Sequence, residues 1–63
     1  MEQRATAVED IWPGDLVYYL GDEHLVARVE ERDGQAHIVF VSLSGRTEYD
    51  ANFFWDSRLL VVG

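Results

Sequence analysis

The dipeptide Asp33-Gly34 separates two segments in which apolar residues recur at alternate positions, and it constrains the fold more than any other feature. Asp-Gly is among the pairs most favoured in two-residue type I′ turns, which join neighbouring antiparallel strands. Residues 25–32 precede the turn and residues 36–42 follow it. The sequence therefore predicts a β-hairpin with Arg32 opposite Gln35.

Counting from this turn assigns each side chain to a face. The pairs expected on the core face are Val29–Ile38, Ala27–Phe40 and Leu25–Ser42, and those on the outer face are Glu30–His37, Arg28–Val39 and Val26–Val41. A second two-residue turn at Ser44-Gly45 places Phe40 opposite Tyr49 and Val41 opposite Glu48. A slip of one residue would turn a whole strand over, so the agreement of both registers on Phe40 favours a three-stranded meander.

The rest of the chain supplies two further strands, at residues 16–20 and 59–62. Five short strands in one small domain favour a closed barrel, because an open sheet leaves strand edges unpaired. We therefore expect an all-β fold, a single five-stranded barrel over residues 11–63. Residues 1–10 are polar and are expected to form an N-terminal arm or a helical turn, with Thr6 and Glu9 spaced as a capping box.

Composition excludes several kinds of chemistry. The 63 residues include 12 acids and 5 bases, a net charge of −7, and no cysteine. The lack of cysteine excludes disulfides and thiolate metal sites. Every base is arginine, which excludes a Schiff-base lysine and the P-loop lysine. The negative charge disfavours direct nucleic-acid binding and favours a basic partner. No apolar run is long enough to span a bilayer, and no signal peptide is evident, so we expect no membrane contact and a cytoplasmic location.

No residue pattern points to catalysis or to a cofactor. His24 and His37 are the side chains that titrate near neutrality, and Asp22 and Glu23 are their nearest candidate co-ligands for a metal. The register places the two histidines far apart on one outer face, so we expect surface histidines and no metal site. No motif positions a general base beside a serine. We therefore expect no enzyme activity and no cofactor.

An apolar strip on the outer face is the main candidate site. A solvated sheet face is normally polar. The residues assigned to a partner-binding surface are Val26, Val39, Val41, Leu43, Tyr18, Phe54 and Trp55. Such a patch needs a cover, which is either a partner or the N-terminal arm through Val8, Ile11 and Trp12.

The residues Gly14-Asp15-Leu16-Val17, Ala27-Arg28-Val29, Ile38-Val39-Phe40, Gly45, Glu48 and Arg58-Leu59 resemble the SH3-like barrels, and within them the Tudor-like group. The resemblance covers about residues 13–62 and implies a small barrel that binds proteins. Tudor-like readers hold a methylated cation in an aromatic cage. At three matching cage positions this chain has Leu25, Leu43 and Phe40, so two of the aromatics are missing.

The size and the Gly14–Val17 start are also similar to the plasmid-borne dihydrofolate reductase, a tetrameric barrel with one shared pore. The Gln-Ile-Tyr strand and the lysine of that enzyme are absent here. We expect a non-enzymatic binding or adaptor module that acts through protein–protein contacts, including self-association as a homo-oligomer. The alternative is an acidic inhibitor or nucleic-acid mimic in a basic groove; a methyl-cation reader and a pore-forming enzyme are weaker alternatives.

Overall fold

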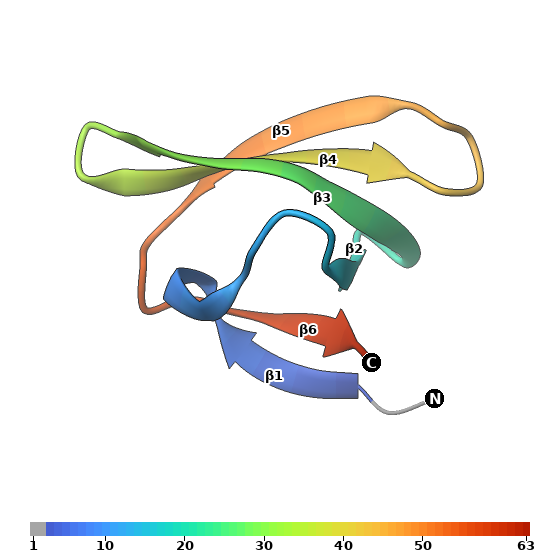
Figure 1. Cartoon of the computed structure of the whole chain (residues 1–63), viewed down its shortest axis with the longest axis horizontal. Helices are drawn as coiled ribbons and strands as arrows, with labels where there is room; N and C mark the ends of the chain where they lie inside the picture. Colours follow the sequence, from blue (N-terminus) through green and yellow to red (C-terminus); the bar gives the residue numbers. More distant parts are fainter. Residues whose placement is uncertain (1–2) are drawn as a thin grey trace.

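A computed structural model describes residues 3–63 as one antiparallel sheet (Figure 1). Its strands are β1 (Gln3–Ala7), β2 (Leu16–Tyr19), β3 (Asp22–Arg32), β4 (Gln35–Ser42), β5 (Glu48–Phe53) and β6 (Arg58–Val62), and a 3-10 turn, η1 (Val8–Asp10), follows β1. The strand order is β1-β6-β2-β3-β4-β5. The sheet curls without closing, because β1 and β5 lie at its two edges. The expected all-β class is confirmed, whereas five strands and a closed barrel are wrong.

The β3–β4 hairpin forms at the predicted turn. Asp33 and Gly34 have φ angles of 52° and 78°, as a type I′ turn requires. The Gly34 N–H also donates to Glu31 Oε2 at 2.7 Å, which fixes the tip of the hairpin. Arg32 lies opposite Gln35, so the predicted register is confirmed at the turn.

A β-bulge changes this register in the middle of β3. Arg28 still faces Val39 as predicted, but the next pair is Val26 with Phe40, so Ala27 is an extra residue on β3. The extra residue turns the first half of β3 over. Val26 therefore points into the core and is only 1% exposed, and its predicted outward position opposite Val41 is wrong.

The β4–β5 connection is longer than expected, although its register is confirmed. Phe40 faces Tyr49 and Val41 faces Glu48. The loop spans residues 43–47, and the Ser42 N–H donates to the Thr47 carbonyl at 2.9 Å. The left-handed residue in it is Arg46, with φ 53°, rather than Gly45.

The N-terminal segment belongs to the sheet. β1 pairs with β6, and η1 leads Val8 and Ile11 into the core at 0% and 3% exposure. Figure 1 shows η1 between the β1–β6 pair and the β3–β5 layer. The expected capping box does not form, because Thr6 Oγ1 donates to the Arg4 carbonyl and η1 has no side-chain cap. Residues 3–11 therefore do not lie over the outer face, and residues 1 and 2 of the expected arm lie outside the described residues.

Aromatic rings fill the concave side of the sheet. Tyr19 stacks on Phe40 with centroids 5.0 Å apart, and Phe53 meets Tyr19 edge-on at 5.8 Å. His24, expected on the surface, is 2% exposed and packs edge-on against Phe40 and Tyr49. The bulge explains this placement, because it also moves His24 to the core face. The buried apolar residues around these rings are Val8, Ile11, Val17, Val26, Ala36, Ile38 and Phe40.

Candidate functional site

A row of apolar side chains crosses the convex side of four strands. Leu16 lies opposite Leu25 on β3 and opposite Val62 on β6, and Leu25 lies opposite Val41 on β4. Directly paired residues in an antiparallel sheet project from the same face. Val17, next to Leu16, is fully buried in the core, so this row points away from it.

A second row adjoins the first. Tyr18 lies opposite Leu60, and Leu43 lies beside Glu23, whose carbonyl accepts the Leu43 N–H at 3.2 Å. Tyr18, Leu25, Leu43 and Leu60 are 40%, 37%, 47% and 38% exposed. Glu23 lies between Tyr18 and Leu43 in the second row. We call the apolar members of the two rows the outer apolar face, formed by Leu16, Tyr18, Leu25, Val41, Leu43, Leu60 and Val62.

The predicted partner-binding residues divide among three places. Tyr18, Val41 and Leu43 lie on the outer apolar face. Val39 points outward next to it but is only 4% exposed, because it sits between Arg28 and Asp50 on the flanking strands. Flanking side chains can cover such a residue with their aliphatic parts.

The other three predicted residues lie elsewhere. Val26 is in the core, and Trp55 packs against the core from the β5–β6 loop. Phe54, in the same loop, is 64% exposed. Figure 1 shows this loop at the opposite end of the molecule from the ends of β4 and β6, where Val41 and Val62 lie. These three residues are therefore not part of the outer apolar face.

Four residues of the outer apolar face were missed: Leu16, Leu25, Leu60 and Val62. The alternation in residues 16–19 would have placed Leu16 with Tyr18 once Val17 was assigned to the core. Leu25 required knowledge of the bulge, and β6 carries four consecutive apolar residues without alternation, so its outward members had no sequence signal.

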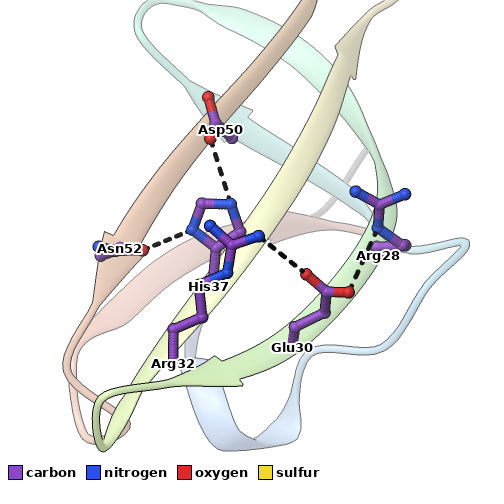
Figure 2. Close-up of polar contacts among 6 residues, drawn as sticks. All are labelled: Arg28, Glu30, Arg32, His37, Asp50 and Asn52. Carbon is purple, nitrogen blue, oxygen red and sulfur yellow. Dashed lines mark hydrogen bonds and ion pairs between the residues drawn. The ribbon is translucent and has the colours of Figure 1, made fainter.

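The outer face of β3–β5 carries a polar cluster beside Val39. His37 Nε2 lies 3.1 Å from Asp50 Oδ2, and its Nδ1 contacts Asn52 Oδ1 (Figure 2). Glu30 bridges Arg28 and Arg32 at 3.7 and 3.8 Å. The His37 side chain is 8% exposed, so its neighbours on β5 hold the ring in one orientation.

The two histidines do not share a site. His24 faces the core, whereas His37 faces outward. Their expected common face is therefore wrong. Within residues 3–63, no group of three or more potential ligands is arranged to hold a metal ion.

Asp22 ties the start of β3 to the β4–β5 loop. Its Oδ2 accepts hydrogen bonds from the Ser44 and Ser42 hydroxyls, the latter at 3.1 Å, and its Oδ1 accepts the Glu23 N–H at 2.8 Å. Hydrogen bonds to a carboxylate favour its charged form. The Ser44 bond, then the Glu23 and Ser42 bonds, lower the pKa of Asp22 below its ordinary value. Both serines thus act as structural donors here.

The fold and surface define a small all-β domain built from one open antiparallel sheet. The chain matches no protein-family model and no curated protein sequence. Over the part of the chain that the structure describes, none of the helices has the length and apolarity needed to cross a membrane.

Proposed function

We propose that this protein is a non-enzymatic binding module that makes protein–protein contacts through the outer apolar face, with a second copy of the chain as one partner. The observation that carries the proposal is the group of exposed apolar side chains of Tyr18, Leu25, Leu43 and Leu60. They adjoin the half-buried Leu16 and Val41 and the buried Val62. We further propose that the open sheet is a variant of the SH3-like small barrel. In this variant the sheet does not close, and β1 and η1 lie where its two ends would otherwise meet.

The energetics favour a covered face. Burying one large apolar side chain contributes roughly 1.5–3 kcal/mol. A contiguous apolar patch on a small protein commonly marks an association surface. Val8 and Ile11 of the expected arm lie in the core and not over this face. This placement supports a separate molecule as the cover.

The charged residues on β3–β5 test the alternative that this protein is an acidic mimic. Such a mimic needs a continuous acidic face. On β3, Glu30 lies between Arg28 and Arg32, whereas β5 carries Glu48 and Asp50 without a base. The two arginines on β3 interrupt the acids of this face, which supports contacts centred on the apolar rows rather than on charge.

Solution mass tests the proposal. If the partner is a second copy, sedimentation equilibrium of the wild type should give a mass above that of the monomer. If the partner is another protein, the mass should rise only when that protein is added. Leu25→Glu and Leu60→Glu place a charge in the centre of the outer apolar face and should abolish either association. Phe54→Glu, an equal change at an exposed aromatic in the β5–β6 loop, is the matched control and should leave association intact.

Salt separates apolar from ionic recognition. Association through the outer apolar face should persist at about 1 M salt, where the Debye length is about 3 Å. The proposal is wrong if the wild type is a monomer and Leu25→Glu captures the same proteins as the wild type. It is also wrong if salt alone releases the partner, which would instead support the acidic mimic.

A further inference from the structure

A groove of about 380 Å³ lies on the opposite side of the sheet from the outer apolar face. It is lined by Glu9, Ile11, Trp12, Pro13, Val29 and Trp55. These residues come from η1 and the segment after it, from the inward-facing part of β3, and from the β5–β6 loop. Two of them are indoles, one is a carboxylate and none is a base. The groove is also distinct from the cage positions Leu25, Leu43 and Phe40.

Hydrogen bonds connect the segments that line the groove. The Glu9 N–H donates to the Trp55 carbonyl at 3.2 Å, which joins η1 to the β5–β6 loop. The Trp12 N–H donates to Asp15 Oδ2 at 2.9 Å, and the Asp15 N–H returns a bond to the Trp12 carbonyl at 3.1 Å. Ile11, at 3% exposure, anchors the floor. A preformed groove avoids part of the ordering cost of binding.

The side chains at the rim indicate what the groove can hold. Trp12 is 69% exposed, which leaves the face of a large aromatic ring in water. Tryptophan is the best aromatic partner for a cation, and guanidinium stacks on it as a flat group. Glu9 supplies a carboxylate that can accept two parallel N–H bonds from the same guanidinium. The chain as a whole carries a charge of −7, so a cationic ligand is also attracted from a distance.

We propose that this groove binds an arginine side chain presented by an extended, basic segment of a partner protein. The guanidinium stacks on indole and pairs with Glu9, while its aliphatic stem contacts Pro13 and Val29. Arg4 and Arg58 border a neighbouring hollow that Glu9 also lines, and among the described residues no ion pair joins Glu9 to either arginine. The Glu9 carboxylate is thus available to a ligand. The site does not depend on the outer apolar face.

The test is an NMR titration of the two indole N–H signals with a short glycine–arginine peptide. The matched probe is the same peptide with citrulline, which has the shape of arginine but no charge. We expect the arginine peptide to shift both indole signals in a saturable way, and the citrulline peptide to bind at least about tenfold more weakly, since ionised hydrogen bonds are about twice as strong as neutral ones.

Variants locate the contact. Glu9→Gln and Trp12→Leu should each weaken arginine-peptide binding roughly fivefold, in line with one cation–π or one charged contact. Glu48→Gln is the control, because it removes the same charge from the exposed edge strand β5. We expect this variant to bind the arginine peptide with unchanged affinity. Far-ultraviolet circular dichroism confirms that each variant keeps the β fold.

Three results would overturn the proposal. Equal affinity for the arginine and citrulline peptides would show an apolar groove without cation selectivity. An equal loss in Glu9→Gln and Glu48→Gln would show attraction by net charge alone. Indole signals that stay unshifted throughout the titration would show that no arginine enters. None of these results bears on association through the outer apolar face, which Leu25→Glu tests separately.

Discussion

Val26 lies directly opposite Phe40 across the β3–β4 ladder, although the hairpin turn alone would place it opposite Val41. The difference arises from Ala27, the extra residue of the bulge. The bulge brings Val26 and His24 into the core and turns Leu25 outward. One inserted residue thus determines both the composition of the core and the make-up of the outer apolar face.

The bulge predicts unequal effects of two valine truncations. Val26→Ala should lower the free energy of unfolding by about 2 kcal/mol, because it removes two buried methyl groups and leaves a cavity. Val41→Ala, on the half-buried outer face, should cost less than about 1 kcal/mol. Urea denaturation of both variants measures the difference. Equal losses would contradict the inward position of Val26.

The hairpin turn predicts a second contrast. Gly34 has φ 78°, a conformation in which a β-branched side chain is strained, so Gly34→Val should destabilise the fold by about 1 kcal/mol or more. Gly45 has no positive φ, and an added Cβ would lie 3.4 Å from Thr47 Oγ1. Gly45→Ala should therefore change stability much less. Thermal melts that shift equally for both variants would argue against the type I′ turn.

The hydrogen bonds to Asp22 predict a loss of stability in acid. The pKa of Asp22 is lower in the folded chain than its ordinary value of 3.8, chiefly through the Ser44 hydroxyl. The folded state therefore binds this proton less readily than the unfolded state does. The stabilisation is fully present above about pH 4 and is lost as pH falls through the folded pKa.

Ser44→Ala removes the largest cause of that shift. Its urea midpoint should lie below that of the wild type at neutral pH, and the gap should narrow as the pH falls below 3.8. Asp22→Asn should remove the same part of the acid dependence. If the difference in urea midpoint between Ser44→Ala and the wild type stays constant below pH 3.8, the ionisation of Asp22 does not contribute to stability.

The orientation of His37 predicts the effect of losing its partner on β5. Asn52→Ala leaves the Nδ1 atom of a nearly buried ring without its acceptor, and an unpaired buried polar group costs about 1–3 kcal/mol. Asp50→Ala removes a partner that is 65% exposed, so water can replace it and the loss should be smaller. Chemical denaturation compares the two variants. A larger loss for Asp50→Ala would contradict this account.

Local features of this fold could be predicted from the sequence, whereas non-local ones could not. Asp33-Gly34 determined the hairpin, because a type I′ turn specifies its own register. The pairing of Phe40 with Tyr49 was also correct, although the loop between them is longer and uses Arg46 as its left-handed residue. The bulge at Ala27 has no glycine or other local sequence signal. The face assignments for the residues of β3 before Ala27 were therefore wrong.

Strand β1 and the β6 part of the candidate site, Leu60 and Val62, depended on distant partners. Residues 3–7 contain no apolar residue larger than alanine, so they carry only a weak strand signal, and β1 forms along the edge that β6 offers. Val8 and Ile11 were hypothesised to cover the outer face, but they lie in the core. The outward members of β6 could be assigned only when its pairing with β2 was known.

The position of β6 governs the order in which the sheet can be completed. β6 comes last in the chain yet lies between β1 and β2, with Gln3 paired to Val62. β1 has no strand to pair with until β6 has docked, and this pairing closes a loop that contains strands β2 to β5. High contact order of this kind slows folding. During synthesis, the β2–β5 meander can form on the ribosome, but β1 must wait until β6 has left the exit tunnel.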